Sequence, residues 1–236
     1  MDEEYLLRFI TVCLLSTLEL SIVQARKEIN LFAERMRRMF GMLNDLLHTT
    51  NENDFNKLFS RIEKYENISD NMELEIANYL NKVTEGRLSS ESKLEIRGML
   101  REVTEIESIG DSCYNLARTI NRKRSGGNDF TEKQYEHIHQ MMQLTDDALA
   151  HMIAIVEDDH HVVDVNKSFN LENEINNYRA QLKNQNVVDV NNKEYDYQMG
   201  VHYMDLIGEC EKLGDYVVNV VEARTNVKEK KTNENR

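Results

Sequence analysis

The residues most able to do chemistry in this sequence are carboxylates that recur at helical spacing. A nine-residue motif with Glu, Gly, Asp and Asn at fixed positions occurs twice, as Glu107-Ser-Ile-Gly-Asp-Ser-Cys-Tyr-Asn115 and Glu211-Lys-Leu-Gly-Asp-Tyr-Val-Val-Asn219. The two copies lie 104 residues apart. Because residues four apart share a helix face, each copy sets its Glu beside its Asp, with the Asn one turn further on.

A second pair of segments repeats at nearly the same offset. Glu66-Asn-Ile-Ser-Asp70 corresponds to Glu172-Asn-Glu-Ile-Asn176, which lies 106 residues later and has Asn in place of the Asp. Two motif pairs at almost one offset predict a duplicated unit of three helices.

These carboxylate pairs indicate cation binding. Like charges four residues apart on a helix repel each other unless a cation neutralises them. Oxygen ligands suit Mg²⁺, Ca²⁺, Mn²⁺ or iron, whereas Zn²⁺ is less natural without clustered His or Cys. The candidate metal ligands are Glu66, Asp70, Glu107, Asp111, Glu211 and Asp215, with Asn115, Asn219 and Glu172 as further candidates. The alternative interpretation is a solvated acidic face, which is common in acidic chains.

The glycine of each nine-residue motif lies inside a predicted helix, where glycine costs about 1 kcal/mol relative to alanine. Close packing of helices would explain Gly110 and Gly214. Backbone approach near a metal site would explain them equally well.

Two Glu-x-x-His matches also occur, Glu136 with His139 and Glu157 with His160. Both belong to one predicted helix and lie roughly 30 Å apart at 1.5 Å per residue, so they cannot share a site within one bundle. We interpret His160 and His161 as turn residues. The sequence contains no phosphate-binding glycine loop and no nucleophile elbow, so we expect no catalytic residues.

The composition favours an all-α fold. Proline is absent and glycine occurs only nine times, which leaves few residues to interrupt helices. The chain carries 29 basic and 42 acidic residues, a net charge of −13 that argues against nucleic acid as a partner. One basic cluster lies at the end of a predicted helix, where cations complement the helix dipole; it comprises Arg118, Arg122, Lys123 and Arg124.

The cysteines and the most apolar segment indicate a cytoplasmic setting. Cys13, Cys113 and Cys210 are widely spaced and odd in number, which favours buried thiols in a reducing compartment over disulfides. The apolar segment 9–20 is shorter than the roughly 20 residues that span a bilayer. We therefore expect it to form part of the first helix or of an extended lead-in.

Turn-rich clusters divide the chain into six predicted helices, at about 17–48, 54–83, 90–124, 131–157, 162–184 and 192–227. The break at 125–127 (Ser-Gly-Gly) is the boundary that we expect between the halves. The expected organisation is an N-terminal lead-in at 1–16, a first three-helix repeat at 17–125, a second at 130–227 and a disordered charged tail at 228–236. Thr131 with Gln134 predicts a capping box.

With Glu-x-x-Gly-Asp-x-x-x-Asn on the third helix of each repeat, the sequence resembles the PhoU family from about Thr17 to Arg224. The resemblance implies an all-α fold of two tandem three-helix bundles. Some members of that family bind metal clusters through Glu/Asp-x-x-x-Asp motifs, which would carry over to Glu66 with Asp70, Glu107 with Asp111 and Glu211 with Asp215. The fourth motif departs from the pattern, since Asn176 follows Glu172.

The segment 20–36, with its Ala-x-x-Glu helix, also resembles the start of the PhoU-like cytoplasmic tail of bacterial sodium/phosphate cotransporters. The resemblance implies a non-catalytic regulator of phosphate transport that works at the inner face of the membrane. Its partner would be a membrane phosphate transporter, in the same or a separate chain, and a homodimer stays open. The alternatives are a carboxylate-bridged, metal-dependent helical-bundle enzyme and a helical scaffold or dimerisation module.

Overall fold

The structure, a computed structural model, describes residues 7–10, 18–158 and 162–234. In this part of the chain every regular element is an α-helix. The six helices are α1 (Leu18–His48), α2 (Glu52–Thr84), α3 (Ser90–Ser125), α4 (Glu132–Glu157), α5 (Asn166–Asn191) and α6 (Tyr197–Glu234).

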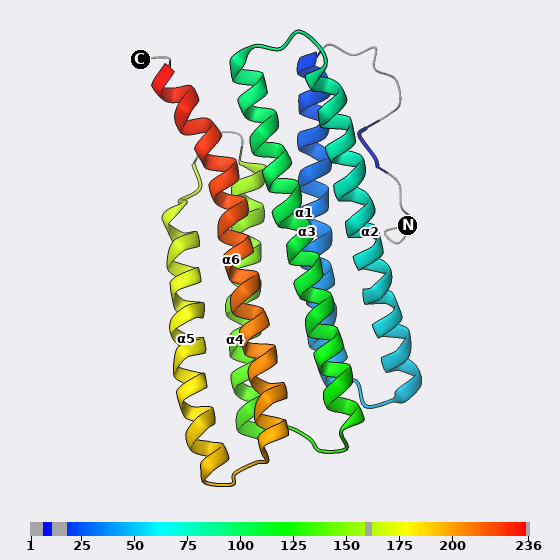
Figure 1. Cartoon of the computed structure of the whole chain (residues 1–236), viewed down its shortest axis with the longest axis vertical. Helices are drawn as coiled ribbons and strands as arrows, with labels where there is room; N and C mark the ends of the chain where they lie inside the picture. Colours follow the sequence, from blue (N-terminus) through cyan, green and yellow to red (C-terminus); the bar gives the residue numbers. More distant parts are fainter. Residues whose placement is uncertain (1–6, 11–17, 159–161, 235–236) are drawn as a thin grey trace.

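The helices form two three-helix bundles that lie side by side (Figure 1). Helices α1, α2 and α3 all pack against one another, and α4, α5 and α6 do the same. The most extensive contact between the bundles joins α3 to α6, and α1 also touches α4. The fold predicted from the sequence, two tandem three-helix bundles, is therefore confirmed.

Reciprocal hydrogen bonds across the contact between α3 and α6 relate the two halves. The Asn115 amide donates to the Glu209 carboxylate at 3.3 Å, and the Asn219 amide donates to the Glu105 carboxylate at 2.9 Å. The two bonds interchange when each residue is replaced by its counterpart 104 positions away. Such exchange is typical of two-fold related surfaces, so the duplicated halves pack with internal pseudo-two-fold symmetry.

The apolar stripes predicted from the sequence form the core. The stripe on α3, from Met99 to Ile120, and the stripe on α6, from Tyr203 to Val221, are buried along their whole length. On α2, Phe55, Ile62, Tyr65, Met72 and Ile76 are buried, while Leu58, Phe59 and Tyr79 pack at the margin.

The break predicted at 184–192 is wrong, because α5 continues to Asn191. The run of Asn and Gln resembles a turn, yet Leu182 and Asp189 are both buried against the bundle. Two residues after the helix end, Lys193 has a φ of 61°, which places it in the left-handed region. The Lys193 amide donates to the Val190 carbonyl and the Glu194 amide to the Asp189 carbonyl, which is a Schellman ending without glycine.

The last two helices also begin later than predicted. Helix α5 starts at Asn166 rather than at 162, and α6 starts at Tyr197 rather than at 192. Helix α6 runs to Glu234, so the backbone of 228–234 is helical where the sequence suggested a disordered tail.

Part of the lead-in lies against α1. The buried Glu28 carboxylate accepts the backbone N–H of Arg8 at 3.0 Å and of Phe9 at 2.8 Å. The Lys27 ammonium lies 5.7 Å from the Phe9 ring centroid. Most of the apolar segment 9–20 falls outside the described residues, and none of the described helices is long and apolar enough to cross a membrane.

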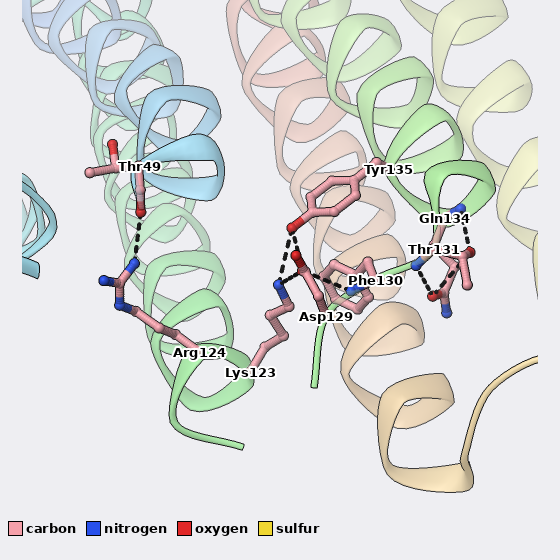
Figure 2. Close-up of polar contacts among 8 residues, drawn as sticks. All are labelled: Thr49, Lys123, Arg124, Asp129, Phe130, Thr131, Gln134 and Tyr135. Atoms are coloured by element: carbon pink, nitrogen blue, oxygen red, sulfur yellow. Dashed lines mark hydrogen bonds and ion pairs between the residues drawn. The ribbon is translucent and has the colours of Figure 1, made fainter. Parts of the chain in front are cut away.

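The basic end of α3 ties the two halves together (Figure 2). The Arg124 guanidinium donates to the Thr49 carbonyl at 2.7 Å, just beyond the end of α1. The Lys123 ammonium binds the Asp129 carboxylate and donates to the Tyr135 hydroxyl at 3.0 Å. These cations therefore bind the α1–α2 loop, the linker and α4, in addition to complementing the dipole of their own helix.

The start of α4 has the predicted capping box (Figure 2). The Thr131 hydroxyl accepts the Gln134 N–H at 3.2 Å, and the Gln134 side-chain oxygen accepts the Thr131 N–H at 3.0 Å. The predicted burial of Cys113 and Cys210 as free thiols is confirmed, whereas Cys13, His160 and His161 lie outside the described residues.

Candidate functional site

Three predicted ligands come together where α2 lies beside α3. Glu66 and Asp70 belong to α2, and Asp111 belongs to α3. One carboxylate oxygen from each lies within 4.8 Å of the others. Glu66 is half-buried, while Asp70 and Asp111 are exposed, so this acidic seam is open to solvent. In the described part of the chain, no other three acidic, His or Cys side chains come as close.

A close approach of the two helices positions these carboxylates. Gly110 precedes Asp111, and Ser69 precedes Asp70. A Cβ atom at Gly110 would lie 2.7 Å from the Ser69 hydroxyl oxygen and 2.8 Å from the Met36 sulfur. Only glycine permits this contact, so the motif's glycine serves helix packing, and the packing in turn brings Asp111 to Asp70.

The electrostatics of the seam show that its negative charge is not compensated. Burial, aided by the charges of Asp111, Glu73 and Asp70, raises the pKa of Glu107 to about 7. Burial also raises the pKa of Glu66, with a further contribution from Asp70. Removing a carboxylate from water and placing others nearby both disfavour its charged form. A bound cation would reverse the second effect.

Two more carboxylates, Glu63 and Glu73, extend the seam along α2, and sequence analysis missed them. The Glu63 carboxylate accepts the Tyr114 hydroxyl at 3.0 Å, and the Glu73 carboxylate accepts the Thr104 hydroxyl at 3.0 Å. Both donors belong to α3. The spacing of three or four residues from Glu63 through Glu66 and Asp70 to Glu73 was the available signal, since it continues one helix face.

The corresponding surface of the second half is different. Its α5 residue Glu172 accepts a hydrogen bond from the Asn176 amide. Its α6 residue Glu211 faces Arg179, with the Nε and carboxylate oxygen 4.0 Å apart. Arg179 lies 106 residues after Glu73, so a cation stands where the first half has an acid. Burial raises the pKa of Asp215.

The remaining candidates, Asn115 and Asn219, lie at the contact between the halves. Their amides donate to Glu209 and Glu105 across α3 and α6. The nine-residue motif therefore contributes to two surfaces. Its Glu and Asp lie on the outer surface of their own bundle, whereas its Asn faces the other bundle.

The raised pKa of Glu107 predicts a pH-dependent stability. The Glu107 pKa of about 7 in the folded state lies above its ordinary value of 4.5. At a pH between these two values, the folded state therefore binds the Glu107 proton more tightly than the unfolded state does. The contribution of Glu107 to stability is then greatest below about pH 4.5 and is lost as the pH rises through about 7. Urea unfolding in chelator-containing buffer at a series of pH values should show that the free energy of unfolding declines less with rising pH for Glu107→Gln than for the parent. Glu75→Gln, an exposed change on α2, should retain the parental decline; an equal decline in all three proteins would contradict the prediction.

The fold and site define a class of protein: a duplicated three-helix bundle with an acidic seam along one half. The PhoU domain profile matches residues 29–120 and 138–223, so the chain belongs to the PhoU family. The matched segments cover most of each repeat.

Solved structures agree with this assignment. The phosphate transport system regulatory protein PhoU from Streptococcus pneumoniae matches with a TM-score of 0.74 and 14% identity, over 90% of this chain and 97% of that one. PhoU from Pseudomonas aeruginosa matches with a TM-score of 0.70 and 13% identity, over 89% and 98%. A search among curated protein sequences gives no significant match.

Proposed function

We propose that this chain is a non-catalytic regulator of phosphate transport whose acidic seam binds a hard or borderline cation. Membership of the PhoU family supports the link to phosphate transport. The observation that carries the cation site is the convergence of Glu66, Asp70 and Asp111 within 4.8 Å. Carboxylate sets of this kind suit Mg²⁺, Ca²⁺, Mn²⁺ or iron. The site's exposure favours ion binding over a closed reaction chamber.

The proposed partner is a membrane phosphate transporter, in the same or a separate chain, which places the protein at the inner face of the membrane. A sodium/phosphate cotransporter is the specific candidate, because segment 20–36 resembles the helix that leads into such tails. The long, exposed flanks of α2 and α5 offer docking surfaces, and an ion on the α2–α3 seam would change the charge of one of them.

A matched pair of variants tests the ion site. Mn²⁺ titration of chelator-stripped protein, followed by calorimetry, should show about tenfold to hundredfold weaker binding for Asp111→Asn, since losing an outer-shell partner alone costs that much. Asp215→Asn removes the equivalent carboxylate of the second half and should leave Mn²⁺ affinity unchanged. Equal Mn²⁺ affinities for the parent and both variants would show that the acidic seam is not the Mn²⁺ site.

The regulatory part is tested separately. Uptake of radioactive phosphate should be compared in cells that contain the transporter together with the parent, Asp111→Asn or Asp215→Asn chain. We expect the parent and Asp215→Asn to change uptake alike, and Asp111→Asn to differ from them. If phosphate uptake is the same with and without the parent chain, the regulatory role is overturned, even where Mn²⁺ binding is intact.

A further inference from the structure

Two imidazoles meet at the junction between the halves, away from the acidic seam. His48 is the last residue of α1, and His139 lies on α4. Their ring centroids are 5.7 Å apart, and the ring planes are inclined by 54°. Both side chains are exposed and border a surface hollow of about 590 Å³, which Glu136, Gln140 and Gln143 also line.

The nitrogens of this pair are free to bind a ligand. In the described part of the chain neither His48 nor His139 forms a hydrogen bond. Two other histidines are engaged: His137 hydrogen-bonds the Tyr203 hydroxyl at 2.9 Å, and His151 contacts the Asp164 carbonyl at 2.8 Å.

The spacing of the rings fits a shared metal ion. Zinc lies about 2.0–2.1 Å from an imidazole nitrogen, so two imidazoles on one tetrahedral ion have centroids roughly 5–6 Å apart. Neutral imidazole is a preferred ligand of Zn²⁺, Cu²⁺ and Ni²⁺. The observed separation of 5.7 Å falls within this range.

Two residues beside His48, Thr49 and Tyr135, form hydrogen bonds of their own (Figure 2). The Tyr135 ring lies 5.6 Å from the His48 ring, and its hydroxyl donates to Asp129 at 2.6 Å. Arg124 binds the Thr49 carbonyl directly after His48. Both neighbours of His48 are therefore anchored, which reduces the rearrangement that ion binding requires of them.

The local charge also suits a cation. His48 ends α1, where the helix dipole is negative, and α4 contributes a carboxylate from Glu136. Glu136 precedes His139 by three residues, so the two side chains share a face of α4. Of the nearby α3 cations, Lys123 is paired with Asp129, and Arg124 donates to the Thr49 and Thr50 carbonyls.

We propose that His48 and His139 bind a borderline divalent cation such as Zn²⁺ and that the ion bridges the two halves. Glu136 becomes a third ligand only after its exposed side chain rotates, because ligand atoms of the three residues do not all lie within 4.8 Å of one another. The site takes ions that prefer nitrogen, whereas the acidic seam takes ions that prefer oxygen. The ion would join α1 of the first half to α4 of the second and so oppose movement of one half against the other.

Zinc titration of the chelator-stripped chain tests the site. The titration is done in an Asp111→Asn background, so that the seam does not compete. His48→Ala and His139→Ala should each weaken Zn²⁺ binding at least tenfold, and Glu136→Gln should weaken it less. His151→Ala, a matched control on α4, should leave the affinity unchanged. Parental affinity in both His48→Ala and His139→Ala, or an equal loss in His151→Ala, would overturn the proposal.

Thermal unfolding gives a second readout that separates ligation from folding. Zn²⁺ should raise the melting temperature of the parent and not that of His48→Ala or His139→Ala, while all three proteins melt alike in chelator. Should His48→Ala unfold early without metal, His48→Gln replaces it, because Gln keeps the side chain's bulk. A Zn²⁺-induced rise that persists in His48→Gln and His139→Ala contradicts the bridge.

Discussion

An Asn176→Asp, Arg179→Glu double variant is expected to bind two Mn²⁺ ions where the parent binds one. Asn176 and Arg179 stand at the positions of Asp70 and Glu73 in the first half. The exchange removes the cation that faces Glu211 and restores the missing carboxylate. Oxygen ligands and their negative charge set the affinity of such sites, so the second seam should acquire the binding of the first.

Calorimetric stoichiometry is the measurement, with unfolding in chelator as a check on the fold. The uncompensated acids should lower stability without metal, and Mn²⁺ should restore it. Lys183→Glu makes the same change of charge as Arg179→Glu alone, one turn away and outside the pattern, so it should leave the stoichiometry at one. If the double variant folds and still binds a single Mn²⁺ ion, the residue types at positions 176 and 179 do not explain the difference in Mn²⁺ binding between the halves.

Gly110→Ala is expected to destabilise the protein by about 1–3 kcal/mol and to weaken Mn²⁺ binding at the seam. The added methyl would lie 2.7 Å from the Ser69 hydroxyl oxygen and 3.2 Å from the Ser69 Cβ, and the Cβ cannot move without its backbone. Helix α2 must therefore shift, which separates Asp70 from Asp111. The gain in helix propensity, about 1 kcal/mol, offsets only part of the strain.

Gly214→Ala is the matched control. Its methyl would meet only the tip of the Ile175 side chain, at 3.3 Å, and a rotation of that flexible end relieves the contact. The helix-propensity gain should then balance or exceed the strain, and Mn²⁺ affinity should not change. Urea unfolding and Mn²⁺ titration of both variants provide the comparison. Equal stability losses in the two variants would show that Ser69 does not set the approach of α2 to α3.

The duplication explains why the halves could be predicted together and why their sites differ. The motif on α3 and α6 has the same Glu, Gly, Asp and Asn in both halves, and its Asn forms the equivalent hydrogen bond in each, to a Glu outside the motif. The facing helices are less alike. Ser69 corresponds to Ile175, so the two glycines meet neighbours of different size.

Some element ends were beyond the reach of local signals. The ending of α5 at Lys193 has no glycine, and the preceding Asn-rich run looks like a turn. The packing of Leu182 and Asp189 against the bundle overrides that local preference. By contrast, the start of α4 was predictable, because the capping box is formed by two residues three apart.

The sequence by itself determined the six helices, their apolar faces and the duplicated acidic motifs, because each depends on spacing along one helix and on residue type. Only the tertiary structure decided which motifs meet. Asp111 reaches Glu66 and Asp70 through the Gly110–Ser69 contact, and His48 reaches His139 through the contact of α1 with α4. Distances between helices depend on the side chains packed between them, and the spacing of residues along a single helix does not reveal those contacts.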